Sequence, residues 1–323
     1  MGIDLGVVVA ILWGSGDILA TLAARQISSF RTAFLSQLAG LIGLLVLGAG
    51  ALWFGYFFFP SETILLGGLF GLFTGLCAAL GYMALYRSLE LGPVAIVGPL
   101  TATSPIFTLI LAALILRENL TLESKGLVVA GILGVILASL NLSELGKFFR
   151  KSGSPLRGSG VRWAIVATFA FGAVDFGIGA SASLSHWFLA ALWTRFFTLV
   201  FLVLFSSGRL FQRWFRRQAG MTSQITQSLP IPVLKNSVTL KPPSPDISLG
   251  VLLALLVGVI EDAAILTFSF ATRIATTGVT SAIASSYGLF VMLFGLLVYR
   301  EKPGWLQLLG VAIFMISLFL LAM

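Results

Sequence analysis

The chain has 323 residues, of which 58% are hydrophobic and 10% are charged, whereas about 25% of the residues in an ordinary soluble domain are charged. This composition excludes a soluble globular protein and indicates an integral membrane protein. The net charge of +8 comes from basic residues in loops, where they set membrane orientation, so nucleic acid is not expected as a partner. With one cysteine, Cys77, and one histidine, His186, neither an intrachain disulfide nor a cysteine- or histidine-rich metal site is expected.

Long apolar runs without period-two alternation predict membrane-spanning helices, because lipid offers no hydrogen-bond partners to other backbone conformations. A spanning helix needs about 20 mostly apolar residues. Ten segments qualify, namely residues 4–24, 31–57, 64–86, 93–116, 124–143, 161–183, 187–206, 248–272, 276–299 and 304–322. The first is interpreted as a retained span, since it lacks the basic start and cleavage site of a signal peptide. The expected fold class is therefore an all-α membrane protein with ten transmembrane helices.

The second half of the chain repeats the first. At an offset of 158 residues, TFAFGAVDFGIGA at residues 168–180 corresponds to part of VVVAILWGSGDILATL at residues 7–22, and Asp17 falls on Asp175. At an offset of 183 residues, a second match joins the segment from Ser88 to Glu118 with that from Ala271 to Glu301. Five spans per repeat is an odd number, so the second copy must be inverted, as in many secondary transporters. We expect five-helix repeats at residues 1–150 and 158–323, with an insert at 207–247.

Lysine and arginine are concentrated on one side of the predicted bundle. Sixteen lie in loops after odd-numbered spans, three lie on the opposite side, and Arg195 lies within a span. Because basic residues stay in the cytoplasm, both termini are expected outside it. In the insert, GRLFQRWFRRQAG is typical of a short helix on an anionic membrane surface, with partner binding as the alternative. The Ser-, Thr- and Pro-rich stretch that follows is expected to be disordered.

Six polar residues fall within the predicted spans: Asp17, Gln37, Asp175, Arg195, Glu261 and Asp262. Charged groups in hydrocarbon are costly, so such residues indicate a substrate or proton site. Four acids and one base would carry a charge of minus three if all were ionised. At least one carboxylate is therefore expected to exchange a proton near neutral pH, which proton coupling requires.

Each of these residues also has a structural interpretation. Asp17 and Asp175 would then only hydrogen-bond to neighbouring helices, and Arg195 would form an internal salt bridge instead of holding a substrate carboxylate. Glu261 and Asp262 are adjacent and point about 100° apart on a helix, so one is expected to line a cavity while the other pairs elsewhere.

Aromatic side chains offer further candidates. Trp13, Trp193, Tyr82 and Tyr287 are candidates for stacking on a substrate, and one or two of them are expected at the cavity. His186 beside Trp187 is expected to form an interfacial aromatic pair. No nucleophile triad, P-loop or HExxH motif is present, so neither an enzyme nor ATP-driven transport is expected.

Three segments together resemble the drug/metabolite transporter superfamily, and within it the ten-helix EamA-like group. They are AILWGSGDILATLA, SLELGPVAIVGPLTATSPIFTLILAALILRENLT and its second copy ATRIATTGVTSAIASSYGLFVMLFGLLVYREK. The resemblance implies an inverted repeat around a central cavity and a secondary carrier, commonly an exporter of amino acids or other small metabolites. Asp17 looks like the first-helix glutamate that carries the coupling proton in the small multidrug-resistance branch, although here it is an aspartate. Members are usually drawn with cytoplasmic termini, which differs from the charge count.

The sequence therefore predicts a secondary active transporter of the cytoplasmic (inner) membrane. It would move a small polar metabolite, amino-acid-like or related, by alternating access with proton-coupled export and without a cofactor. Asp17 and Asp175 are the expected coupling acids, and Glu261, Asp262, Arg195 and Gln37 are expected to shape the substrate site. The alternatives are a cationic drug or amine exporter, a lipid-linked substrate translocator and a membrane sensor.

Overall fold

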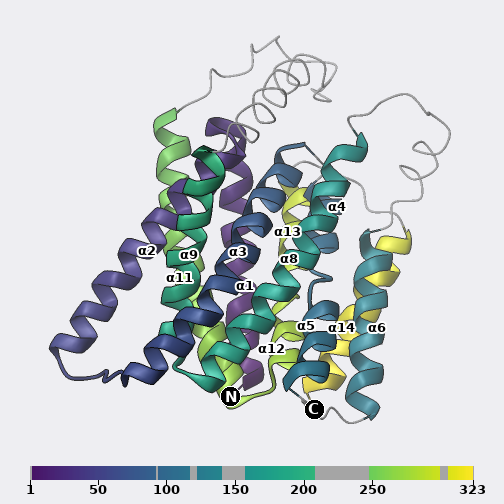
Figure 1. Cartoon of the computed structure of the whole chain (residues 1–323). Helices are drawn as coiled ribbons and strands as arrows, with labels where there is room; N and C mark the ends of the chain where they lie inside the picture. Colours follow the sequence, from purple (N-terminus) through teal and green to yellow (C-terminus); the bar gives the residue numbers. More distant parts are fainter. Residues whose placement is uncertain are drawn as a thin grey trace.

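The computed structural model describes residues 2–91, 94–116, 122–139, 157–207, 247–298 and 305–322, and every element in them is helical. The elements are α1 (Gly2–Ile27), α2 (Ser29–Trp53), α3 (Ser61–Leu91), α4 (Val94–Thr101), α5 (Pro105–Leu111), the π-helical turn η1 (Ala112–Leu116), α6 (Leu122–Ser139), α8 (Arg157–Leu184), α9 (Trp187–Ser207), α11 (Ile247–Ile274), α12 (Thr277–Ala284), α13 (Tyr287–Val298) and α14 (Trp305–Ala322). The helices form one elongated bundle (Figure 1). The prediction of an all-α membrane protein is confirmed.

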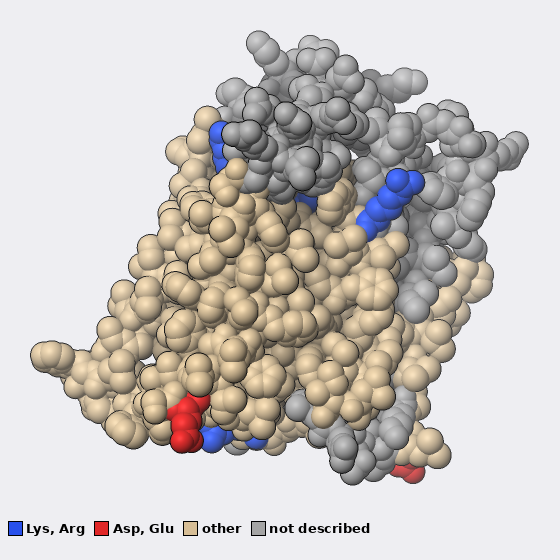
Figure 2. All heavy atoms as spheres, in the orientation of Figure 1, with Lys and Arg blue, Asp and Glu red and all other residues tan. Residues whose placement is uncertain are grey.

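Seven helical stretches in the described part of the chain are long and apolar enough to cross a membrane: 4–27, 29–53, 61–91, 162–184, 187–207, 247–274 and 277–294. The other three predicted spans fall on α4 with α5 and η1, on α6, and on α14, so the count of ten stays a prediction. Both termini lie at the same end of the bundle, as an even number of crossings requires (Figure 1). On the face shown in Figure 2, the charged side chains of described residues lie toward the two ends, and the described surface between them shows none.

Pairs of helices from the two predicted repeats lie alongside one another. α1 packs along α11, α3 packs along α8, and α6 lies beside α14. Glycines permit the closest approaches: a Cβ on Gly258 of α11 would lie 3.0 Å from the backbone nitrogen of Gly40 in α2. On α3, a Cβ at Gly75 would lie 2.8 Å from the backbone nitrogen of Thr198 in α9. Small residues at such contacts let helix backbones meet closely in lipid, where packing replaces the hydrophobic drive to associate.

Two of the predicted spans are interrupted near their middles. The first breaks between Thr101 and Pro105, where the amide of Ser104 donates to the carbonyl of Thr101 at 3.1 Å. Because proline has no N–H to donate, Pro105 can begin α5 but cannot continue α4. The second span breaks at residues 285–286, between α12 and α13, and this break contains no proline. Both interruptions place irregular backbone near the centre of the bundle.

The connections at three helix ends are very short. Only Ser28 separates α1 from α2, and its backbone has φ 86° and ψ 153°, a region that residues other than glycine rarely adopt. The Ser28 carbonyl accepts hydrogen bonds from both the amide and the hydroxyl of Thr32, at 3.0 and 2.9 Å. Two residues connect α8 to α9, and two connect α11 to α12. The predicted insert at 207–247 lies outside the described residues, apart from its first and last residues.

Candidate functional site

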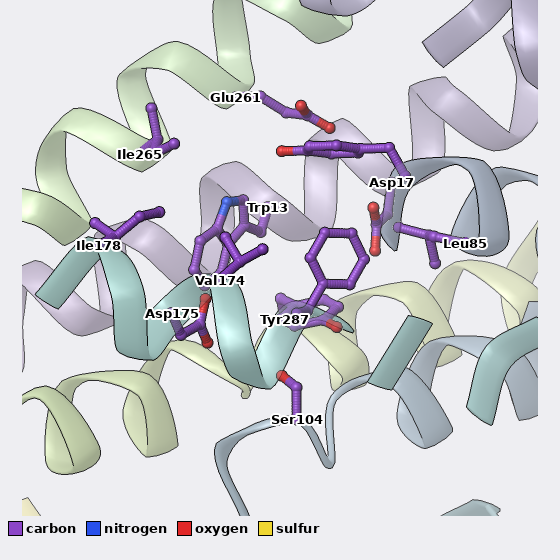
Figure 3. A pocket seen from close by; sticks show the side chains of 12 residues that line it. Trp13, Asp17, Leu85, Ser104, Val174, Asp175, Ile178, Glu261, Ile265 and Tyr287 are labelled. Atoms are coloured by element: carbon purple, nitrogen blue, oxygen red, sulfur yellow. The ribbon is translucent and has the colours of Figure 1, made fainter. Parts of the chain in front are cut away.

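A pocket lies at the centre of the bundle between helices of both predicted repeats (Figure 3). It holds about 550 Å³ of empty space, counting the part that opens outward. Its polar wall contains three carboxylates, those of Asp17 on α1, Asp175 on α8 and Glu261 on α11. Its aromatic wall contains Trp13, Tyr82, Phe171 and Tyr287. Three of the six predicted polar residues therefore meet at one cavity.

Asp17 projects from the middle of α1 into this pocket and is only 6% exposed. Among the described residues, none donates a hydrogen bond to its carboxylate. The nearby hydroxyl of Thr21 donates to the backbone carbonyl of Asp17 and not to its side chain. Glu261 lies on the adjoining helix, with its Cγ 3.6 Å from where a Cβ on Gly16 would stand. A carboxylate without a donor in an apolar setting retains a strong demand for a proton or a cation.

Asp175 is buried to a similar degree but has a different environment. The hydroxyl of Ser281 on α12 donates to Asp175 Oδ2 at 2.6 Å. The same hydroxyl lies 3.4 Å from Thr108 Oγ1, and the Thr108 hydroxyl donates to the carbonyl of Gly172 at 3.1 Å. These contacts join α5, α8 and α12 around Asp175. In Figure 3, Asp175 and Asp17 lie on opposite sides of the pocket.

Arg195 stands at the centre of a buried network behind the pocket wall and is 1% exposed. Its Nε donates to Asp262 Oδ1 at 2.8 Å, and its Nη1 donates to Glu261 Oε2 at 3.1 Å and to Gln37 Oε1 at 2.6 Å. The Tyr86 hydroxyl donates to the second oxygen of Glu261 at 2.7 Å. The network thus connects α2, α3, α9 and α11, and it fixes the carboxylate of Glu261 from behind.

This network decides how charge is distributed around the pocket. Arg195 is engaged by two carboxylates, so this group of three side chains carries one negative charge if all three are ionised. Asp17 and Asp175 bring the total to minus three if both are ionised. Among the described residues that line the pocket there is no lysine or arginine. The cavity therefore offers acceptors for a cation and no basic side chain for a substrate carboxylate.

The structure places the remaining candidates as follows. Gln37, Arg195 and Asp262 belong to the network and do not line the pocket. Trp193 does not line it either and packs against Gly67 of α3. Phe171 was not singled out from the sequence, although it stands at the 158-residue offset from Trp13. Ser104, Thr108 and Ser281 were also missed, because serine and threonine hydroxyls in a span usually bond to their own helix and give no distinct signal. Tyr86, which donates to Glu261, was missed as well.

His186 lies away from the pocket, between α8 and α9. Its ring contacts those of Phe57 and Phe59 at centroid distances of 5.3 and 5.0 Å, and that of Trp187 at 5.6 Å. Burial, together with the nearby positive charge of Arg273, lowers the pKa of His186. The amide of Phe188 donates to its Nδ1 at 3.2 Å, which fits the neutral ring.

Residues 1–140 match the EamA-like transporter family, which confirms the resemblance inferred from the sequence. A solved structure described as "Crystal structure of protein" resembles the chain with a TM-score of 0.60 at 13% sequence identity. The alignment covers 99% of this chain and 96% of that one, and at such low identity the likeness concerns the fold. No curated protein matches the sequence. The family match over residues 1–140 and the apolar helices indicate a multi-pass membrane protein whose first part is similar to EamA-like transporters.

Proposed function

We propose that this chain, whose first 140 residues match the EamA-like transporter family, is a proton-coupled secondary transporter of small organic cations that carry an amine or ammonium group. The observation that carries the proposal is the composition of the central pocket: three carboxylates and four aromatic rings line it, and Arg195 is held by Glu261 and Asp262. An amine or ammonium compound is one of the three alternatives drawn from the sequence. The main expectation, an amino-acid-like metabolite, needs a basic partner for its carboxylate.

The recognition chemistry follows from charge and ring geometry. An ammonium group is attracted both to a carboxylate and to the face of an aromatic ring, and the second attraction contributes about 0.5–2 kcal/mol. Trp13 packs against Tyr287 with ring centroids 6.0 Å apart, and Tyr82 packs against Phe171 at 5.2 Å. A cation that enters the pocket would meet Asp17 and these aromatic rings, all of which line it.

Coupling arises if the proton and the cation compete for the same carboxylate. When the cation binds, the proton on Asp17 leaves to water, and when the cation departs, a proton from the other side replaces it. The pocket then stays close to the same net charge throughout, which the surrounding hydrocarbon requires. Alternating exposure would come from movement of the two five-helix repeats against one another, as inverted repeats permit. Exchange in this sense, with protons entering as substrate leaves, supports export.

The proposal is tested with three ligands that share one branched alkyl group: isoamylamine (a cation), leucine (a zwitterion) and isocaproate (an anion). The purified protein in detergent should be stabilised against heat by isoamylamine most and by isocaproate least. Binding of isoamylamine should release protons into weakly buffered solution, which an indicator dye reports. Equal or stronger binding of leucine would favour the amino-acid alternative, and preferential binding of isocaproate would refute a cation site.

Flux is measured in proteoliposomes with tetramethylammonium, whose fixed charge prevents it from crossing lipid unaided. Uptake should depend on the imposed pH gradient and should disappear in Asp17→Asn. The matched control is Glu62→Gln. Glu62 is an exposed carboxylate in the first turn of α3 and does not line the pocket. Binding of isoamylamine without any gradient-dependent flux would favour a sensor over a carrier.

A further inference from the structure

The contacts of α1 have counterparts around α8, at the offsets that relate the two predicted repeats. A Cβ on Gly14 would lie 2.8 Å from the Cβ of Phe290, and a Cβ on Gly172 would lie 2.6 Å from the Cβ of Phe107. Gly172 follows Gly14 by 158 residues, and Phe290 follows Phe107 by 183. Asp17 and Asp175 each lie three residues after these glycines, so the two acids occupy corresponding positions in corresponding helix pairs.

The partners of these two acids are nevertheless different. Asp175 is bound by Ser281, which in turn contacts Thr108. At the offset of 183 residues, the counterparts of Ser281 and Thr108 are Gly98 and Val291. Gly98 and Val291 also face each other, because a Cβ on Gly98 would lie 2.8 Å from the Cβ of Val291. The first acid thus has an equivalent local arrangement from which both hydroxyl groups are missing.

The missing hydroxyls change what each carboxylate can do. A buried acceptor that receives a short hydrogen bond is satisfied, whereas one without a donor carries most of its desolvation penalty until a proton or cation reaches it. The titratable groups near Asp17 are Glu261 on α11, Tyr82 and Tyr86 on α3, and Tyr287 on α13. None of them is a cation. Arg195 already binds Glu261 and Asp262.

We propose that the two corresponding acids have divided roles: Ser281 and Thr108 hold Asp175 as a fixed joint between α8 and α12, and Asp17 alone exchanges the proton for the substrate. This inference deepens the proposed function and rests on it. It differs from the expectation that both acids couple transport. Ser281 is then a positioning residue, which keeps Asp175 from competing with Asp17 for the proton.

Infrared difference spectra between acid and alkaline pH test the division without any substrate. A protonated carboxyl group gives a carbonyl band that shifts on deuteration, so each acid that titrates contributes to the band. Asp17→Asn should remove a pH-dependent band, and Asp175→Asn should leave it unchanged. Ser281→Ala should create an additional titrating band. This band should disappear when Asp175→Asn is combined with Ser281→Ala. Ser281→Thr keeps a hydroxyl group at this position, so it should not create the band. Loss of the band in Asp175→Asn with its retention in Asp17→Asn would overturn the inference.

Gradient-driven tetramethylammonium uptake provides the second readout. Asp17→Asn should abolish exchange of tetramethylammonium for protons, whereas Asp175→Asn should slow uptake but keep its dependence on the pH gradient. Identical loss of gradient dependence in both variants would refute the divided roles while leaving the carrier function intact. If wild-type protein shows no gradient-dependent uptake, the proposed function fails, and the infrared result still reports whether the two acids differ.

Discussion

Replacing Arg195 by glutamine should destabilise the protein by about 3–5 kcal/mol, the range for breaking a buried ion pair by removing one partner. The structure gives the same magnitude by a second route. Arg195 donates to carboxylates at 2.8 and 3.1 Å, and each hydrogen bond to a charged group contributes about 1.5–3 kcal/mol. Its bond to Gln37 at 2.6 Å is lost as well, and the side chain is only 1% exposed, so water cannot replace these donors.

The assay is unfolding in mixed detergent micelles, followed by the helical circular dichroism signal. Arg31→Gln is the matched control, because Arg31 is exposed near the start of α2, and surface substitutions of this kind are usually within about 0.5 kcal/mol of wild type. Arg195→Gln combined with Asp262→Asn should be more stable than Arg195→Gln alone, since the second change removes one unpaired carboxylate. A non-additive effect is expected for residues in direct contact.

Two results would refute this reasoning. The first is an Arg195→Gln variant as stable as Arg31→Gln. The second is a double variant no more stable than Arg195→Gln. If the Arg195→Gln variant kept its stability but no longer bound leucine, Arg195 would instead bind a substrate carboxylate. The hydrogen-bond network around Arg195 argues against that interpretation.

Three further predictions concern packing, pH and orientation. Gly258→Ala should destabilise the bundle by about 1–3 kcal/mol in the same unfolding assay, because its Cβ would meet the backbone of α2, whereas Gly50→Ala, with open space around it, should not. The pKa of His186 is lowered in the folded protein, so the stabilisation from its neutral ring should be complete above about pH 6.5 and should be lost as the pH falls toward the lowered pKa. In His186→Gln, the free energy of unfolding should no longer show this decrease. Cysteines introduced near either terminus of a Cys77→Ala variant should react with an impermeant thiol reagent from outside the cell, and labelling only after the membrane is opened would contradict the lysine and arginine bias.

The spans were predictable because lipid imposes a length and a composition that few other constraints disturb. The run predicted at 64–86 extends in the structure from Ser61 to Leu91, so the ends shift by a few residues while the element remains. Pro105 signals the first interruption, since proline cannot continue a helix hydrogen-bond ladder. The second interruption, at residues 285–286, carries no comparable residue and was not predicted from the sequence.

The candidate site was harder to predict because it depends on how each helix is rotated. Intramembrane acids must find water, a cation or a donor, which is why all six polar residues of the spans could be singled out from the sequence, but not the three acids that line the pocket. Which of Glu261 and Asp262 faces the pocket follows only from the packing of α11 between α1 and α2. The hydrogen bond from Ser281 to Asp175 was harder still to predict, because most serines and threonines in these helices bond to a carbonyl three or four residues back.

The single residue between α1 and α2 has a mechanical consequence. With only Ser28 outside the two helices, and with its carbonyl held by Thr32, neither helix can slide along its axis without displacing the other. Asp17 on α1 is thereby connected through a single residue to α2, at whose far end Trp53 is 86% exposed. If α1 moves during transport, we expect the indole of Trp53 to be displaced with α2, so that its fluorescence would report the movement.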